Sequence, residues 1–359
     1  MAEIRQRDDG ILNSIRMIAP GTPLREGLDN ILRAKTGALI AVGDNPEIMA
    51  LVDGGFFINS EFTPAHLYEL AKMDGGIILS YDTKKILYAN TQFIPDPSIP
   101  SSETGIRHRT AERVARQTGE MVISISQRRN IITLYKGYSK YIVKDSSSIL
   151  SKANQAIQTL EKYKAVLDRA KVNLTSLEYE DLVTILDVAT VIQRTEMVLR
   201  ISHEIEKYLI ELGNEGRLIS MQMEELVANV REDGTNIIRD YSRVQDDENY
   251  NATGRAIRNL SSEELLDLAQ ICRLLGYEGD LNSLETPVSP KGYRLLSKIP
   301  RLPAVVIENL VKEFEGLNNI MTASIHDLDE VEGIGEVRAH IIKEGLKRLQ
   351  EQVLLDRII

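Results

Sequence analysis

A regular apolar repeat in the middle of the chain constrains the fold more than any other feature. After Ser146-Ser147-Ser148, which can cap a helix, small or apolar residues recur in alternating steps of four and three, at Ile149, Ala153, Ala156, Leu160, Tyr163, Leu167, Ala170 and Leu174. This spacing is a heptad seam, typical of a helix that packs along its length against another helix. A helix over these residues is about 40 Å long at about 1.5 Å per residue. A helical spacer or bundle is therefore predicted to divide the chain.

The 359 residues exceed one ordinary domain, and three regions are predicted. Residues 1–145 alternate helix-like and strand-like segments, which predicts an α/β domain with a mixed sheet and flanking helices. Residues 146–287 predict an all-α helical spacer, and 288–359 a C-terminal domain of tandem helix-hairpin-helix form. Strands are expected at 37–43, 76–80, 85–89, 121–126, 130–135 and 140–143, with helices starting near Ile11, Thr22, Thr63 and Thr110.

Further helices are expected in the spacer at 182–209, 216–239 and 263–280. The polar residues 240–262, rich in Asp, Asn and Arg, are expected to form a loop or mobile link. The one cysteine, Cys272, falls on the last of these helices and is expected to be an ordinary core residue.

Composition excludes several classes of function. The net charge of −10 gives no bulk attraction to DNA or to an anionic membrane. A single cysteine excludes a disulfide framework and a Cys-based metal site. The polar N-terminus lacks the apolar core of a signal peptide, and no run approaches the roughly 18 apolar residues of a membrane helix. A cytoplasmic protein without a membrane partner is expected.

The stretch from Asp74 to Arg129 gathers the residue types that handle a polyphosphate. Asp74-Gly75-Gly76 lies where a predicted helix gives way to the apolar run Ile77-Ile78-Leu79. A carboxylate at such an edge can ligate Mg²⁺ or Mn²⁺ and help deprotonate a ribose hydroxyl. The two glycines allow close approach of the backbone to a base or sugar. Asp-Gly-Gly is also an ordinary turn sequence, so this motif alone does not decide the function.

Arginines are concentrated in the same stretch. Residues 101–129 contain six Arg and three Glu, and Arg107-His108-Arg109 is expected to precede a helix directly. Guanidinium groups and a helix N-terminus can both bind phosphate oxygens. The alternative is a solvated basic loop with a structural histidine. Arg128-Arg129 follow a predicted strand and add charge, although alone they are typical of a surface turn.

The C-terminal segment contains an internal repeat of 32 residues, in which Leu296, Ile299, Leu302, Ile307, Leu310 and Phe314 match Leu328, Val331, Ile334, Ala339, Ile342 and Leu346. The second copy contains the loop Val331-Glu332-Gly333-Ile334-Gly335, in which glycines can let backbone N–H groups approach a DNA phosphate. Residues 291–359 carry ten Lys or Arg against eleven Asp or Glu, so DNA binding is expected to be salt-sensitive and independent of sequence. A purely structural αα-hairpin is the alternative.

These motifs together resemble the bacterial diadenylate cyclases that scan DNA integrity, and the resemblance covers essentially the whole chain. It rests on Lys72-Met73-Asp74-Gly75, Ser102-Glu103-Thr104-Gly105, Arg107-His108-Arg109-Thr110-Ala111-Glu112-Arg113 and Val331-Glu332-Gly333-Ile334-Gly335-Glu336. It implies the condensation of two ATP into cyclic di-3′,5′-adenosine monophosphate with release of two pyrophosphates. Because the product is two-fold symmetric, two sites must face each other across an isologous interface. The family forms octamers.

The resemblance also implies residue roles. Asp74 would carry the metal and activate the ribose hydroxyl, and Gly75, Gly76 and the backbone near Phe93 would hold the adenosine. The phosphates would be bound by Arg107, His108, Arg109, Thr110, Ser126, Arg128 and Arg129. The C-terminal loop would bind branched DNA such as recombination junctions and thereby slow synthesis, through Gly333, Ile334, Gly335, Arg338 and Lys343.

Two positions depart from the family pattern. Gly76 replaces the alanine of Asp-Gly-Ala, and Ile106 stands where some relatives have a threonine. The first is expected to loosen the preorganised site, and the second removes a hydroxyl. Two other hypotheses therefore stay open. One is a non-enzymatic DNA-junction-binding protein whose N-terminal domain senses nucleotide, and the other is a structural scaffold built on the heptad seam.

Overall fold

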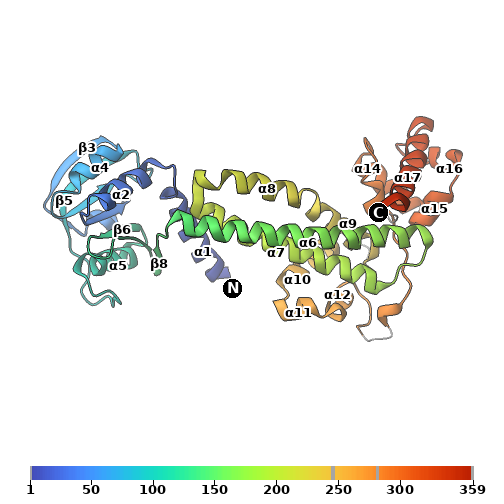
Figure 1. The fold of residues 1–359 in the computed structure, drawn as a ribbon, viewed down its shortest axis with the longest axis horizontal. Helices are drawn as coiled ribbons and strands as arrows, with labels where there is room; N and C mark the ends of the chain where they lie inside the picture. The colour runs from blue at the N-terminus through green and yellow to red at the C-terminus, as the bar shows by residue number, and fades with distance from the viewer. Residues whose placement is uncertain (1, 244–246, 280–282, 357–359) are drawn as a thin grey trace. The chain divides into compact units, whose positions relative to one another are not determined.

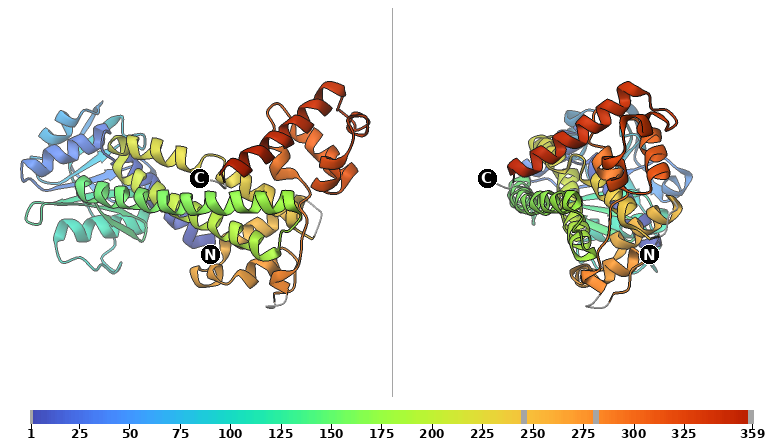
Figure 2. Two further views of the ribbon diagram at one scale, coloured as in Figure 1. Left: turned by 45° about the vertical axis from the view of Figure 1, so that its right-hand side comes forward. Right: turned by 90° about the vertical axis from the view of Figure 1, so that its right-hand side faces the viewer.

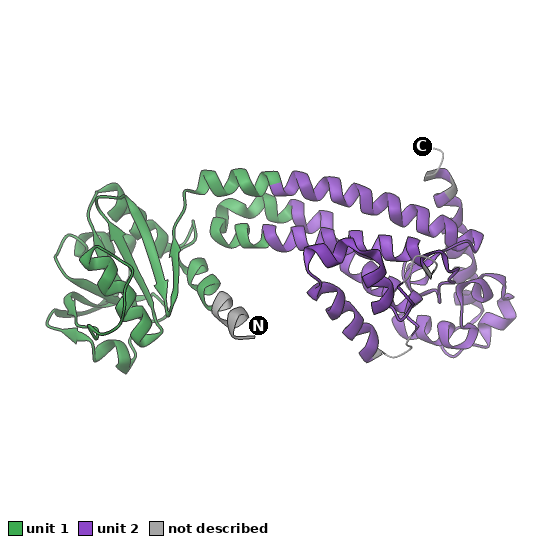
Figure 3. Cartoon of the chain, turned by 90° about the horizontal axis from the view of Figure 1, so that it is seen from below, with its two compact units in different colours: residues 1–155, 206–221 green, residues 156–205, 222–359 purple. Residues whose placement is uncertain are grey.

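The computed structural model describes residues 2–243, 247–279 and 283–356 (Figure 1). Two compact units are distinguished in this part of the chain (Figure 3). The first contains the chain up to residue 155 together with 206–221, and the second contains 156–205 and the chain from 222 onward. The predicted domain boundaries near residues 145 and 287 stay predictions.

One mixed sheet forms the centre of the first unit. Its strand order is β2-β5-β4-β1-β6-β7-β8, with β3 also paired to β5. β1 and β4 are parallel, and the other described pairs are antiparallel. The mixed sheet predicted from the sequence is confirmed, with strands β1 Ala38–Val42, β2 Val52–Asp53, β3 Phe56–Glu61, β4 Gly76–Leu79, β5 Lys85–Phe93, β6 Met121–Ser126, β7 Ile131–Lys136 and β8 Ser139–Ile142.

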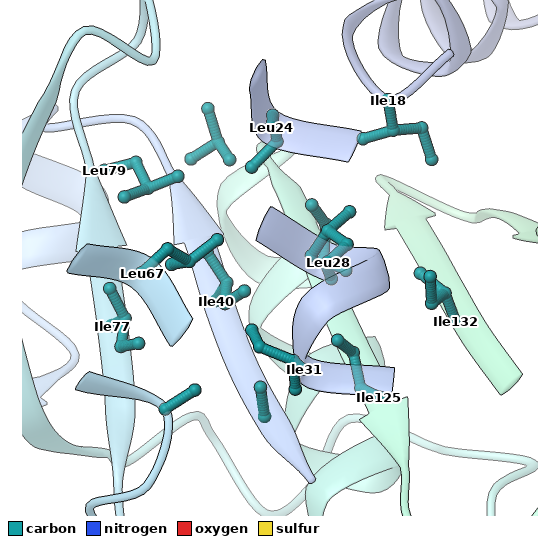
Figure 4. Packing of buried hydrophobic residues seen from close by; sticks show 14 of the residues in the cluster. Ile18, Leu24, Leu28, Ile31, Ile40, Leu67, Ile77, Leu79, Ile125 and Ile132 are labelled. Carbon is teal, nitrogen blue, oxygen red and sulfur yellow. The ribbon is translucent and has the colours of Figure 1, made fainter. Parts of the chain in front are cut away.

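Two helices that begin with Thr-Pro cover one face of the sheet. The side chain of Thr22 caps α2 (Pro23–Arg33) by accepting from Arg25 N at 3.2 Å. Thr63 caps α4 (Pro64–Leu70) in the same way, with His66 N at 3.0 Å. Figure 4 shows the aliphatic core beneath them, and the labelled side chains are Ile18, Leu24, Leu28, Ile31, Ile40, Leu67, Ile77, Leu79, Ile125 and Ile132. Ile18 directly follows the first helix, α1 (Ala2–Met17).

The opposite face of the sheet is covered by α5 (Ile106–Thr118) and the short α3 (Pro46–Met49). Both contribute to a second apolar cluster, which contains Leu39, Ala41, Ile48, Leu51, Ile78, Phe93, Ala111, Val114, Ala115, Val122 and Tyr135. Because α5 packs on the central strands, its first turn is held at one end of the sheet.

Two long helices follow, α6 (Ser146–Glu180) and α7 (Ile185–Leu212). The 35 residues of α6 span about 50 Å at about 1.5 Å per residue. Within the second unit α7 returns beside α6 (Figures 1 and 2). The seam prediction is wrong at Tyr163, which is 41% exposed, while Ile157 is buried. It is confirmed where the seam is fully buried, at Ile149, Ala153, Leu160, Leu167 and Leu174.

The helix predicted at 216–239 is two helices. A short 3₁₀ turn, η1 (Gly213–Gly216), leads into α8 (Arg217–Val227), and α9 (Val230–Tyr241) follows. The break falls at Asn229, whose φ of 61° is left-handed, a conformation in which asparagine is enriched.

The prediction of a loop at 240–262 is wrong, because α10 (Asp247–Asn259) lies within it. Tyr250 and Ile257 are two turns apart and both buried, so packing of one face stabilises a helix of polar composition. Residues 244–246 of that prediction lie outside the described residues.

The helix predicted at 263–280 is α11 (Ser262–Leu266) followed by α12 (Leu268–Leu274). The break falls at Asp267, whose carboxylate accepts from Ala269 N at 3.0 Å and so starts a new helix. Cys272 on α12 is fully buried, as expected. Beyond Gly279 the description resumes with a 3₁₀ turn, η2 (Ser283–Glu285).

A buried polar cluster joins three helices of the second unit: Glu178 on α6, Asp240 on α9 and Arg294 on α13 (Tyr293–Leu296). The Arg294 guanidinium donates to Glu178. The Asp240 carboxylate accepts backbone N–H groups at the start of α13, including that of Arg294 at 3.0 Å. Burial raises the pKa of Asp240 to about 7, and the Glu178 carboxylate acts in the same direction.

The C-terminal helices form two equivalent helix–loop–helix copies around a common core. The turn N–H of Leu302 donates to Ile299 O, and that of Ile334 donates to Val331 O. Arg301, with φ of 64°, occupies the left-handed position that Gly333 takes in the second copy. The long α17, red in Figure 2, contributes one face to this core, through Ala339, Ile342 and Leu346. The helices are α13, α14 Ala304–Phe314, α15 Leu317–Thr322, α16 Ile325–Asp329 and α17 Glu336–Asp356.

Candidate functional site

The candidate residues of the first unit meet at one end of the sheet. β1 begins there, where Leu39 is opposite Gly76 at the start of β4. β6 ends there, because Ile125 is opposite Ala38, and β5 ends there, because Thr91 is opposite Gly76. Strand register therefore brings together the turn at Asp74, the strand end at Phe93 and the turn after Ser126.

The two glycines after Asp74 are required by close packing. Gly75 has φ of 101°, and a Cβ on it would come within 2.8 Å of the Asn90 backbone. A Cβ on Gly76 would lie 2.2 Å from Cε2 of Phe93, a residue that is 6% exposed. The space of an alanine methyl at position 76 is thus filled by the Phe93 ring.

Asp74 and Arg107 form an exposed ion pair at this end of the sheet. Arg107 Nη2 lies 3.8 Å from Asp74 Oδ1, and the Asp74 side chain is fully exposed. The guanidinium lies against Gly37, immediately before β1, where a Cβ would come 2.1 Å from Arg107 Nη1. Gly37 therefore belongs to this sheet-end cluster, although it is part of none of the motifs read from the sequence.

The Arg-His-Arg run forms the first turn of α5, and the prediction that it precedes the helix is wrong. The helix starts four residues early because the Gly105 carbonyl already accepts from Arg109 N at 2.9 Å. Gly105 provides no side-chain cap, so the first N–H groups remain available to an anion. The Arg109 side chain donates to the carbonyl oxygens of Glu103 and Thr104 at 3.3 and 3.4 Å, and Thr110 is half-buried.

Other arginines of the stretch stabilise the loop before α5. Arg113 Nε donates to Ile99 O at 2.8 Å, and Arg116 donates to Pro100 O. Arg116 also pairs with the buried Glu112, which accepts from Ser102 N at 3.0 Å. These two guanidinium groups are engaged with the protein, so the count of six arginines overstates the charge available to phosphate.

His108 belongs to a hydrogen-bonded chain that reaches β7 and β8. Its Nδ1 lies 3.0 Å from the Tyr135 hydroxyl, which donates to Glu103 Oε1 at 2.9 Å. Glu103 also pairs with Lys140. Burial lowers the pKa of His108, Lys140 and Arg129 lower it further, and the Glu103 carboxylate opposes them. Burial raises the pKa of Glu103, but hydrogen bonds from Lys140 and Tyr135 outweigh it and leave the pKa below its ordinary value.

The β6–β7 turn brings the last basic residues to the same end of the sheet. Ser126 Oγ accepts from Arg129 N at 3.2 Å, and the Ser126 carbonyl accepts from Asn130 N at 2.9 Å. The turn is closed by Asn130 at φ of 53°. Arg128 and Arg129 are exposed on it.

The C-terminal candidates lie in the second copy of the repeat. Gly333 has φ of 85°, Ile334 is buried, and a Cβ on Gly335 would meet nothing closer than Asp329 Oδ1 at 3.9 Å. Arg338 donates to the Gly333 carbonyl. Lys343 Nζ donates to Met321 O at 2.6 Å, so a phosphate would have to replace that bond.

Comparison with known proteins decides the family. A family model described as the DisA bacterial checkpoint controller nucleotide-binding region matches residues 25–139, and one described as the DisA bacterial checkpoint controller linker region matches 143–284. The DNA integrity scanning protein DisA of Carboxydothermus hydrogenoformans is 63% identical over 346 residues, which cover 96% of this chain and 98% of that protein. This chain belongs to the DisA family. The proteins of the same name from Clostridium kluyveri and Acetivibrio thermocellus are 60% and 59% identical, over 98% of this chain and 98% of each relative.

The sheet-end cluster lies inside the segment matched by the DisA nucleotide-binding model. The residues that the motifs missed are Gly37 and Tyr135, which lie in the same segment but outside any recognisable pattern. Among the described helices, none combines the length and apolar character needed to cross a bilayer.

Proposed function

We propose that this DisA-family chain is a diadenylate cyclase, which condenses two ATP into cyclic di-AMP and two pyrophosphates. The observation that carries the proposal is the pairing of exposed Asp74 with Arg107 at 3.8 Å. The pair lies at a sheet end where the glycine backbone after Asp74 and the N-terminal turn of α5, which carries Arg107, are joined by the basic side chains of the β6–β7 turn. Membership of the family and the nucleotide-binding match support it.

Each residue has a role in this proposal. Gly75 and Gly76 let the adenosine lie against backbone beside Phe93. The phosphates are bound by the first turn of α5 and the β6–β7 turn, through Arg107, His108, Arg109, Thr110, Ser126, Arg128 and Arg129. Arg109 must exchange its bonds to the Glu103 and Thr104 carbonyls for phosphate oxygens.

The chemistry is two identical transfers. The 3′-hydroxyl of one ATP attacks the α-phosphorus of the other, a P–O3′ bond forms and the bond to the β-phosphate bridge breaks. Asp74 helps remove the hydroxyl proton, and pyrophosphate leaves in line with attack. The second transfer, with the roles exchanged, closes the ring.

A divalent cation, Mg²⁺ or Mn²⁺, fits the donor set at Asp74. In the part of the chain that the structure describes, no three His, Cys, Asp or Glu side chains are grouped to hold a metal. Mg²⁺ commonly binds through one or two carboxylates together with substrate phosphates and waters. Asp74 would supply the protein ligand and the triphosphate the rest, and the cation would neutralise phosphate charge.

A single copy offers only half of this site. Asp74 is fully exposed, whereas two transfers with exchanged roles require two nucleotides held face to face. Three large apolar side chains next to site residues are exposed: Met73, Ile94 and Ile106, at 39, 55 and 82%. We infer that a second copy covers this face in a homo-oligomer, in keeping with the octamer implied by the family resemblance.

The C-terminal repeat is the proposed DNA-binding part. Its second loop has the helix-hairpin-helix form, in which Gly333 and Gly335 let the N–H groups at the start of α17 approach a phosphate. Ile334 anchors the loop from inside, and Arg338 and Lys343 add charge. We propose that branched DNA binds here and modulates synthesis.

The deciding experiment incubates the chain with ATP and Mg²⁺ or Mn²⁺ and measures cyclic di-AMP and pyrophosphate. We expect two pyrophosphates per cyclic product and loss of both in Asp74→Asn. Nucleotide binding without pyrophosphate would instead support a DNA-junction protein with a nucleotide-sensing domain. Unchanged synthesis by Asp74→Asn would refute the role of Asp74.

A further inference from the structure

The hydrogen-bond chain behind His108 has a direction. The Glu103 carboxylate, paired with Lys140, is an acceptor in its ionised form. The Tyr135 hydroxyl donates its proton to this carboxylate in a hydrogen bond of 2.9 Å. The hydroxyl therefore has no proton left to donate to His108. Toward His108 Nδ1, 3.0 Å away, the Tyr135 oxygen can offer only a lone pair. Nδ1 must therefore carry the N–H.

This direction determines the other ring nitrogen of His108. A neutral imidazole has one N–H, so with the proton on Nδ1 the Nε2 atom carries a lone pair. Nε2 is buried and has no hydrogen-bond partner among the residues that the structure describes. The neighbouring Cδ2 lies 3.9 Å from the position of a Cβ on Gly105, which places this edge of the ring beside the N-cap of α5.

The charged groups around the ring come from three elements. Glu103 lies in the loop before α5, Lys140 is on β8, and Arg129 is in the β6–β7 turn. Burial and the two cations disfavour a charged imidazole, while the negative charge of Glu103 favours it. Without a ligand, therefore, the pKa of His108 lies below its ordinary value and the neutral imidazole is favoured.

We propose that Glu103 and Tyr135 keep the Nε2 lone pair of His108 vacant for one proton, which the protein takes up when a nucleoside triphosphate binds. This inference rests on the proposed function, since it needs the phosphates at the start of α5. A proton from solvent forms the Nε2–H bond, and His108 becomes a cationic donor to a phosphate oxygen. On release of the anion the proton returns to solvent.

Nucleotide binding is expected to drive this proton uptake because the Nε2 lone pair and a phosphate oxygen repel each other. Phosphate oxygens repel an unprotonated Nε2, whereas a nearby anion stabilises the imidazolium and raises its pKa. The protonated ring gains charge-assisted hydrogen bonds on both sides, to phosphate and, through Tyr135, to Glu103. Glu103 and Tyr135 act through His108 and are positioning residues. Nucleotide affinity is then expected to fall as pH rises between the lower pKa of free His108 and the higher pKa of the complex.

Proton uptake can be counted without catalysis. The full chain is titrated with Mg²⁺ and the α,β-methylene analogue of ATP by calorimetry, in buffers of different ionisation enthalpy and over a range of pH. We expect the wild type to take up a proton at pH values between the pKa of His108 in the free protein and that in the complex, and His108→Gln to lose this uptake. Tyr135→Phe keeps the buried ring but breaks the chain, so the midpoint of uptake is expected to shift.

Two further variants make the test specific. Tyr81→Phe, in a turn at the opposite end of the sheet and 69% exposed, makes the same chemical change and should leave uptake unaltered. Glu103→Gln retains an acceptor for Tyr135 without the charge, and should shift the midpoint to lower pH even if Tyr135→Phe fails to fold.

Nucleotide binding by the wild type with no proton uptake would overturn the inference, as would the same uptake midpoint in the wild type and Glu103→Gln. Absence of any nucleotide binding would instead count against the proposed function.

Discussion

Gly76 and Phe93 are expected to behave as one packing unit, so that a change in one is tolerated only with a change in the other. In Gly76→Ala the new methyl would lie 2.2 Å from Phe93 Cε2, so the ring must move by more than 1 Å to restore an ordinary contact. Overpacking of this kind costs about 1–3 kcal/mol. Phe93 is 6% exposed and packs with Leu39, Ile78 and Val114, so it has little free space to move into.

Phe93→Leu alone removes part of a buried ring and should cost roughly 1–2 kcal/mol, less than the loss of a whole aromatic side chain. In the double variant the alanine methyl enters the space that the ring leaves. The two costs should therefore not add, and a coupling energy of roughly 1–2 kcal/mol is expected, within the range for residues in contact.

The assay is chemical denaturation of the four proteins, followed by nucleotide affinity for each. Nucleotide affinity should fall most in Gly76→Ala, because the new methyl pushes the Phe93 ring toward the place where adenosine is proposed to bind. Affinity should recover in the double variant, which has no ring to displace. Gly254→Ala on α10 is the matched control, since its Cβ would meet nothing closer than 3.8 Å. A neutral Gly76→Ala, or strictly additive costs, would refute the reasoning.

Three other outcomes are expected. Gly335→Ala has room for its methyl, so DNA affinity in an anisotropy titration should fall with the unfolding midpoint unchanged; equal affinity would exclude this loop as the contact. Arg294→Met removes the guanidinium that pairs with the buried Glu178 and should cost about 3–5 kcal/mol in denaturant unfolding, and a cost under 1 kcal/mol would contradict this. Because the pKa of Asp240 is raised to about 7, the folded state binds that proton more tightly than the unfolded state. The contribution is present below about pH 4 and lost as pH rises toward 7, so wild-type stability should decline over this range more than that of Asp240→Asn.

The sequence predicted those helices and strands whose formation depends on residues within the same short segment. Thr22-Pro23 and Thr63-Pro64 start helices because a threonine cap and a proline act within one turn. The fully buried strands β1 and β4 were visible as short apolar runs, and α6 as a heptad seam. α10 was missed because its composition is polar and its helix depends on two buried side chains a full two turns apart.

The site divides in the same way. Asp74, the glycines and Arg107 lie in short motifs, so the sequence could single them out as candidates. The pairs Gly37 with Arg107, Gly76 with Phe93 and His108 with Tyr135 join segments that are far apart in the chain. They depend on strand register and on the packing of α5, which no single segment contains. For the same reason the sequence could not separate Arg113 and Arg116, which hold a loop, from arginines that face the site.

The central claim is that one copy holds half of a catalytic site, and the specific activity as a function of protein concentration tests it most directly. Cyclic di-AMP formation and light-scattering mass are measured on the same samples through a dilution series. We expect product per chain to fall in step with dissociation of the oligomer, and to return on reconcentration. A monomer that makes cyclic di-AMP with constant activity per chain would contradict the claim.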